Sequence, residues 1–142
     1  MTSQIRIADE EAISSIRPQY HFRPAPEGLL AWDVRRLVRL SRELPVQAVP
    51  LSQIAELDSV HWYGHGSVKP TVRSIIEHCQ LMLAADLAYP IILDSAGRVM
   101  DGMHRVSKAL MQGATQIGAV QFERDPAPDY VDCDPDLLPY DD

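Results

Sequence analysis

Two long stretches of the chain place apolar residues at helical spacing. The first, LLAWDVRRLVRLSREL, predicts a helix over residues 29–43, because that spacing joins Leu30, Val34, Leu37, Val38, Ser41 and Leu44. The second, TVRSIIEHCQLMLAAD, predicts a helix over residues 71–85 with one apolar face, made of Val72, Ile75, Ile76, Cys79 and Leu83. Pro70 and Thr71 are start signals for this second helix.

Shorter apolar runs predict strands. VQAVPLSQI predicts a short strand that enters a turn, and YPIILD (89–94) a buried strand closed by a Ser-Ala-Gly turn. A second short strand over 98–100 precedes a helix over 103–112, which Gly113 is placed to end, and TQIGAVQFE (115–123) is the last strand. Hairpin-like and crossover connections are thus mixed around one small sheet with helices packed on it, so the predicted fold class is α+β.

The two ends of the chain differ in character from the middle. Residues 1–28 carry Pro18, Pro24 and Pro26 and predict an irregular arm, which with the helix after it makes an N-terminal part over 1–45. Residues 46–124 form the predicted core. Residues 125–142 form an acidic, proline-rich tail, predicted to be extended and draped over the body by Tyr130, Leu137, Leu138 and Tyr140. The chain of 142 residues suits one globular domain overall.

The net charge of −7 is confined to the tail, which has seven Asp and no Lys or Arg. The residues before it carry 13 basic and 13 acidic side chains, so this body has no general attraction for nucleic acid. No apolar run approaches the roughly 18 residues of a membrane span. The first residues lack the pattern of a signal peptide, and two cysteines make no disulfide framework, so we expect a cytoplasmic protein with no membrane partner.

The stretch MDGMHRVSKAL places four candidate site residues at a predicted strand-to-helix junction: Asp101, Gly102, His104 and Arg105. The first N–H groups of a helix lack partners and attract anions, and Gly102 permits close backbone approach by a ligand. Arg105 offers a fork of donors that matches phosphate oxygens, and His104 adds further donors. Asp101 is a candidate Mg²⁺ ligand or general base. These residues predict a site for a phosphorylated ligand, with phosphoryl transfer as an option.

A purely structural reading of the same residues remains open. Asp101 would then cap the helix, Gly102 would form a tight turn, and His104 and Arg105 would be solvated. Short glycine-containing motifs are weak signals by themselves. Lys108, one turn after Arg105, either extends the phosphate site or is exposed.

The order helix, PIIL strand, SAGR turn, short strand, DGMHR, helix, Gly and strand resembles the ParB/sulfiredoxin superfamily over residues 46–123. The specific element is the Gly-x-His-Arg step, which in this superfamily binds nucleotide phosphates; the resemblance therefore implies that Gly102, Met103, His104 and Arg105 bind phosphate. Sulfiredoxins have a catalytic Cys where this chain has Met103, so sulfinic acid reductase activity is not expected. ParB proteins usually have Gly-Glu-Arg-Arg at this step.

The motif is most similar to that of ParB-like free serine kinases, Asp-Gly-His-His-Arg, which differs from residues 101–105 only at Met103. The resemblance implies that Asp101 assists phosphoryl transfer, and that a Glu in an earlier loop, here Glu56, is also catalytic. It also implies ATP or ADP with Mg²⁺ as cofactors. The reaction would be transfer to a small hydroxyl compound, or hydrolysis of the nucleotide.

A glycine-rich loop, HWYGHGSVKP, precedes the helix over 71–85. Its polar members are predicted to form a lid or substrate loop, with an ordinary surface loop as the alternative: His61, His65, Ser67 and Lys69. The two histidines are four residues apart, but Gly64 and Gly66 disfavour the helix that a metal site of this spacing needs. The Trp62-Tyr63 pair either stacks on a base or packs under the loop.

A basic face on the first predicted helix supports a second class of function. It consists of Arg35, Arg36, Arg39 and Arg42. The face is either a stripe paired with acidic residues, for which the tail is an obvious partner, or a nucleic-acid contact. With the ParB-like core, it makes a non-catalytic DNA-associated or partition-type interaction module the alternative to a nucleotide-binding enzyme. A third reading is a degenerate domain that has lost its ligand, for which Met103 is the main support.

Overall fold

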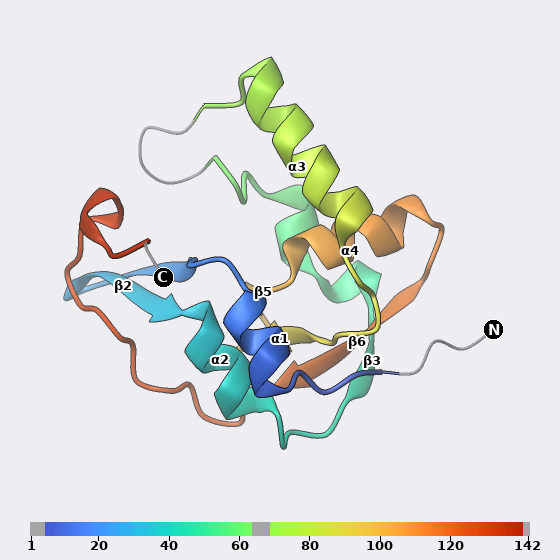
Figure 1. Cartoon of the computed structure of the whole chain (residues 1–142), viewed down its shortest axis with the longest axis horizontal. Coiled ribbons are helices and arrows are strands. Elements are labelled where there is room, and N and C mark those ends of the chain that lie inside the picture. The colour runs from blue at the N-terminus through green and yellow to red at the C-terminus, as the bar shows by residue number, and fades with distance from the viewer. Residues whose placement is uncertain (1–4, 64–68, 141–142) are drawn as a thin grey trace.

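The computed structural model describes residues 5–63 and 69–140 and shows a small α+β domain (Figure 1). Its α-helices are α1 (Glu10–Ser15), α2 (Val34–Ser41), α3 (Val72–Ala84) and α4 (Met103–Met111). Its strands are β1 (Tyr20–Ala25), β2 (Gly28–Asp33), β3 (Gln47–Pro50), β4 (Ile91–Leu93), β5 (Val99–Asp101) and β6 (Gln116–Gln121). Short 3₁₀ turns are η1 (Leu51–Gln53), η2 (Ala55–Asp58) and η3 (Pro135–Leu137).

The central sheet has the order β3-β6-β4-β5, with β4 parallel to β6 and the other pairs antiparallel. The predicted mixed sheet and its strands are therefore confirmed. Successive side chains of a strand point to opposite faces. In β4, Ile91 and Leu93 pack with α4 on one face, while Ile92 packs with Trp32 and Leu37 on the other. The sheet is thus the middle layer between α4 and the α2 region.

A second, two-stranded sheet corrects the prediction of one sheet and of a helix over 29–43. Residues 28–33 are strand β2, paired antiparallel with β1, and α2 begins only at Val34. The Asp33 side chain accepts a hydrogen bond from the Arg35 N–H and marks the real helix start. Trp32 is 1% exposed and enters the core, so long-range pairing and burial override the local helical spacing.

The prediction of an irregular arm over residues 1–28 is also wrong. Asp9 caps α1 by accepting a hydrogen bond from the Ala12 N–H at 2.8 Å, and Ile13 is completely buried. Arg35 fixes the end of this segment by donating to the Ile16 carbonyl at 2.8 Å. The prolines that suggested an arm lie around β1 or within it, where an edge strand tolerates them.

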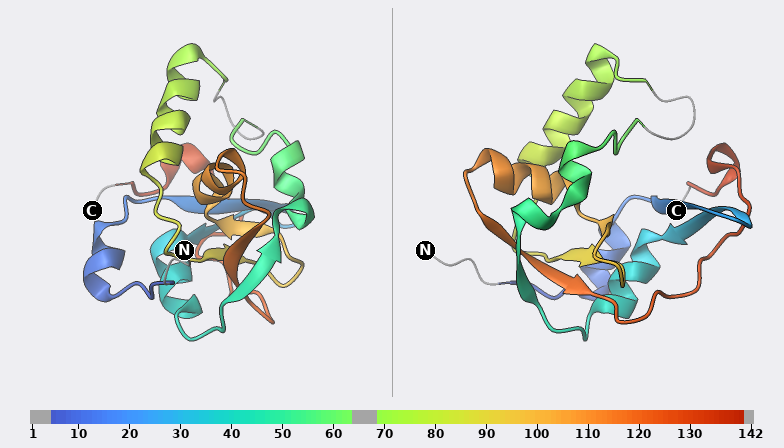
Figure 2. Two further views of the ribbon diagram at one scale, coloured as in Figure 1. Left: turned by 90° about the vertical axis from the view of Figure 1, so that its right-hand side faces the viewer. Right: turned by 180° about the vertical axis from the view of Figure 1, so that it is seen from behind.

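Helix α3 forms as predicted, but it stands out from the body in all three ribbon views (Figures 1 and 2). It has no buried residue. The apolar face proposed from the sequence is exposed, with Val72 at 75% and Leu83 at 72%. The helix packs on α4 instead through its opposite flank, where His78 contacts His104. No helix in the described ranges is long and apolar enough to cross a bilayer.

The tail is draped over the body, as predicted, and it lies along the unpredicted β1–β2 sheet. Tyr130 forms a β-bridge with Ala31, and the Tyr20 hydroxyl donates to the Pro139 carbonyl. Leu138 is buried, whereas Leu137 is 81% exposed, so of these two leucines only Leu138 anchors the tail.

Candidate functional site

The DGMHR motif connects β5 to α4 through a left-handed residue. Gly102 has φ of 114°, and a Cβ there would meet the Cγ2 atom of Ile91 at 2.6 Å. The backbone at Gly102 therefore lies so close to Ile91 of β4 that a larger residue would force a shift. No side chain caps α4, so Asp101 is not the cap that the structural reading expected. The first N–H groups of α4 therefore have no side-chain acceptor, and helix N–H groups of this kind attract anions in general.

Arg105 is partly occupied by the protein itself. Its guanidinium donates to the carbonyls of Tyr89 at 3.2 Å and Pro90 at 2.6 Å, and to the Asp101 carboxylate at 2.7 Å. Both partners of this ion pair are 16% exposed. Arg105 has five N–H donors, so a ligand would share the guanidinium with these groups rather than receive the whole fork. The same bond restricts Asp101 as a metal ligand or a base.

His104 is held in a stack of aromatic rings. Trp62 lies over His104 at 4.8 Å and over His78 at 4.3 Å between ring centroids, and His78 Nδ1 is 2.8 Å from His104 Nε2. Burial, followed by the charges of His78, Arg17, His61 and Arg105, lowers the pKa of His104 to about 4. The ring is therefore neutral at pH 7. Trp62 thus packs against side chains of α3 and α4; residues 64–68 of the loop under which it was expected to pack lie outside the described residues.

A cavity of about 520 Å³ opens beside this motif. Its lining joins the start of α4 to the N-terminal segment, α2, the end of α3, and the strands β4 and β6. Most lining side chains are apolar, such as Ile16, Val38 and Ile92. The polar lining includes Arg6, Arg17, Arg42, Asp86, Asp101, His104 and Arg105.

Arg17 is a charged lining residue of the cavity that the sequence did not single out. Its positive charge lowers the pKa of both His78 and His104, although burial is the largest cause for each, which places its guanidinium near the histidine pair. Within residues 5–63 and 69–140 no hydrogen bond or ion pair engages its side chain. The sequence does contain a signal that could have found it. Asp9 followed by two Glu residues is typical of a helix start, and a helix there would have placed Arg17 next to a packed element. We call Arg17, Gly102, His104 and Arg105, with the cavity, the α4 site.

Other predicted residues lie away from this cavity. Lys108 Nζ donates to the carbonyls of Leu83 at 3.1 Å and Ala85 at 2.7 Å, and so caps the end of α3 rather than extending a phosphate site. Glu56 accepts a hydrogen bond from the Val99 N–H, and Met103 is 6% exposed in the core. The lining includes none of these three side chains.

The predicted lid is only partly described. His61 packs edge-on against Trp62 with ring centroids 6.0 Å apart, and Lys69 is exposed. His65 and Ser67 lie outside the described residues. The described part of the chain holds no group of three or more His, Cys, Asp or Glu side chains arranged to hold a metal ion.

The basic face of α2 is engaged within the protein. Arg36 pairs with Asp129 of the tail at 3.3 Å, as predicted. Arg39 and Arg42 pair instead with Glu10 of α1, at 3.3 and 3.2 Å. These contacts take up much of the positive face on which a nucleic-acid contact would depend.

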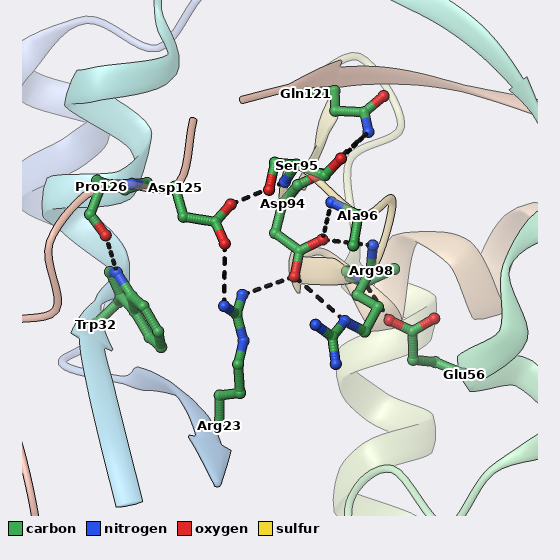
Figure 3. A network of polar contacts seen from close by, with 11 residues as sticks. Arg23, Trp32, Glu56, Asp94, Ser95, Ala96, Arg98, Gln121, Asp125 and Pro126 are labelled. Carbon is green, nitrogen blue, oxygen red and sulfur yellow. Dashed lines mark hydrogen bonds and ion pairs between the residues drawn. The ribbon is translucent and has the colours of Figure 1, made fainter. Parts of the chain in front are cut away.

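A second polar cluster, absent from the predictions, lies where the N-terminal part meets the tail (Figure 3). Asp94 is completely buried and accepts hydrogen bonds from Arg23 at 2.6 Å and from the Ala96 and Arg98 N–H groups. Arg23 also donates to Asp125 at 3.0 Å (Figure 3). We call Arg23, Asp94, Arg98 and Asp125 the Asp94 cluster.

Burial and hydrogen bonding act in opposite directions on the pKa of Asp125 in this cluster. Burial by itself raises the pKa of Asp125, but hydrogen bonds from the Ser95 N–H and from Arg23 outweigh it and hold that pKa below its ordinary value. Burial, and then the Arg23 charge, lowers the pKa of the neighbouring His21 to about 4.

Comparison of the chain with protein-family models, curated proteins and solved structures gave no match. The resemblance of residues 46–123 to the ParB/sulfiredoxin superfamily therefore stays a prediction.

Proposed function

We propose that this protein binds a small phosphorylated ligand of nucleotide size in the cavity of the α4 site. The proposal rests on one observation: the uncapped start of α4 and several arginine side chains lie around the same cavity. Its volume of about 520 Å³ lies within the range of small-molecule sites. Arg17 supplies a cation that no other described residue engages.

The chemistry of the lining fits a ligand with a charged end and a less polar body. Phosphate oxygens accept hydrogen bonds from helix N–H groups and from guanidinium groups. The remaining walls are mostly apolar, and they include Tyr89, whose aromatic side chain suits packing against a nucleobase. ADP and ATP, with or without Mg²⁺, are therefore the proposed ligands to test first.

Binding is better supported than phosphoryl transfer. A general base or a metal ligand needs a carboxylate that is not already committed, and Asp101 accepts a hydrogen bond from Arg105. Glu56 is bound to the β5 backbone outside the cavity. Transfer would require the Asp101–Arg105 pair to open, so catalysis is a separate proposal that follows only if binding is established. The engaged arginines of α2 give the DNA-associated alternative no comparable support.

Calorimetry on the wild type and on Arg17→Gln tests the proposal. The titrants are ADP, ATP, CTP and pyrophosphate, each with and without Mg²⁺. Loss of one charged hydrogen-bond donor predicts affinity about tenfold weaker in Arg17→Gln. Arg124→Gln is the matched control, because Arg124 is exposed and lies outside the lining. Absence of binding by the wild type to all four titrants would overturn the proposal.

A further inference from the structure

His104 of the α4 site shares one hydrogen bond with His78, and the direction of that bond decides what His104 offers to a ligand. His78 Nδ1 and His104 Nε2 are 2.8 Å apart, so one nitrogen carries a proton and the other a lone pair. A neutral imidazole carries a single proton. If His78 donates, the proton of His104 is on Nδ1. If His104 donates, its Nδ1 is only an acceptor.

The second ring nitrogen of His104, Nδ1, is accessible to solvent. No hydrogen bond to another described residue engages Nδ1. Among the described residues, every fully buried side-chain nitrogen and oxygen has a hydrogen-bond partner. Nδ1 therefore reaches solvent, and His104 is a lining residue of the cavity.

The surroundings of the pair disfavour a positive charge on it. Charged or titratable groups face it from every neighbouring segment: Arg17, His61, Tyr63, Glu77 and Arg105. The two arginines oppose protonation, and Glu77 counters them only at His78. Burial is the largest cause of the lowered pKa of each histidine. Both rings are therefore neutral near pH 7, and the one-proton bond between them persists.

We propose that His104 binds the ligand as a neutral imidazole through Nδ1–H, and that His78 is the positioning residue that selects this tautomer by donating to His104 Nε2. A phosphate oxygen accepts hydrogen bonds and cannot donate when ionised, so it pairs with Nδ1–H and not with a lone pair. Trp62 holds both rings nearly parallel, at 19° to His78 and 13° to His104, which keeps the bond in place. This inference rests on the proposed ligand site and adds a residue, His78, that is not a lining residue.

Two substitutions of His78 separate the hydrogen bond from the packing. His78→Phe keeps an aromatic ring under Trp62 and removes the nitrogen. His78→Asn loses the ring and places an amide donor at about the position of Nδ1. The proposal predicts ADP and pyrophosphate affinity about tenfold weaker in His78→Phe and within about threefold of wild type in His78→Asn. A role in packing alone predicts the reverse order and would overturn the proposal.

Long-range ¹H–¹⁵N NMR of the histidine rings gives the independent readout. With ADP bound, His104 of the wild type is expected to carry its proton on Nδ1, with His78 Nδ1 protonated. Binding of ADP with the His104 proton on Nε2 would overturn this inference and leave the ligand site intact. Absence of ADP and pyrophosphate binding would overturn both proposals.

Discussion

The Asp94 cluster and the α4 site are both rich in arginine and carboxylate groups. They differ in how many of their hydrogen-bonding groups have partners within the protein. In the Asp94 cluster, the central carboxylate has no exposed surface and is surrounded by donors of the protein (Figure 3). In the α4 site, the helix start has no cap and a cavity of about 520 Å³ adjoins it. A buried, satisfied network stabilises a fold, whereas unfilled donors around a cavity suit a ligand. The difference predicts that loss of the Asp94 carboxylate weakens the fold, whereas loss of the Arg17 side chain weakens binding.

Asp94→Asn is expected to have the largest effect. It removes a buried charge that faces Arg23 and leaves donors unsatisfied, so we expect a loss of about 3 kcal/mol in the free energy of unfolding. Urea unfolding measures it, with Asp58→Asn as the control because Asp58 is exposed. Equal stability of the two variants would contradict the structural role of the cluster.

Gly102→Ala is expected to cost nearly as much, about 2–3 kcal/mol, since a left-handed φ is combined with a clash against Ile91. Gly113→Ala is the matched control. Its φ is 80°, but no atom lies within 4 Å of the added Cβ, so only the backbone strain of about 1 kcal/mol remains. Thermal unfolding compares the two, and a similar cost for both would show that α4 and β4 are not in such close contact.

Acid is expected to weaken the fold between pH 6.5 and 4. The folded-state pKa values of His21 and His104 are lowered to about 4, from about 6.5 in the unfolded chain. The unfolded state therefore binds protons first as the pH falls, and the stability present above pH 6.5 is lost towards pH 4. For His21 we expect about 2 kcal/mol, allowing for its partial exposure. Unfolding measured across this range should depend less on pH in His21→Phe, and an unchanged slope would contradict the assignment.

Arg17→Gln is expected to change binding without changing the fold. We predict ADP affinity about tenfold weaker, with the free energy of unfolding within about 0.5 kcal/mol of wild type, because no other described residue bonds to this side chain. Calorimetry and urea unfolding together give both values. A variant that unfolds more easily but binds normally would reverse the distinction between the two regions.

Lys108→Met is expected to have the smallest effect, and on stability rather than on binding, which is the reverse of Arg17→Gln. It removes the donors to the last carbonyls of α3, so we expect a loss of about 1 kcal/mol in stability and unchanged ADP affinity. Lys69→Met is the control because its side chain is exposed. Weaker ADP binding by Lys108→Met would restore the sequence prediction that Lys108 contacts phosphate.

Local patterns predicted the elements that follow one another closely in the chain. The strands β4 and β5, the helix α4 and its glycine terminator Gly113 all lie in one continuous stretch, and their signals are strong at short range. The prediction for the N-terminal part was wrong because the structure of this part depends on residues that are distant in the sequence. Trp32 enters the core and donates to the Pro126 carbonyl, 94 residues away. No spacing rule detects such a contact.

Only the residues of the candidate site that belong to one short motif were predicted from the sequence. Gly102, His104 and Arg105 were singled out because they are adjacent in the sequence. All three line one cavity, and their role in binding stays a prediction. Arg17 and His78 come from segments 87 and 26 residues from His104 in the chain, and the fold brings them to it. The side chains of Lys108 and Glu56 have the right chemistry for phosphate binding and catalysis. Both are instead hydrogen-bonded to backbone groups of the protein.

An ADP titration followed by backbone ¹H–¹⁵N NMR tests the central claim most directly. If ADP binds in the α4 site, saturable shifts are largest at the amides of Met103, His104 and Arg105, with little change at Ser95 and Ala96 beside the Asp94 cluster. Absence of saturable shifts, or shifts centred on Ser95 and Ala96, would contradict it.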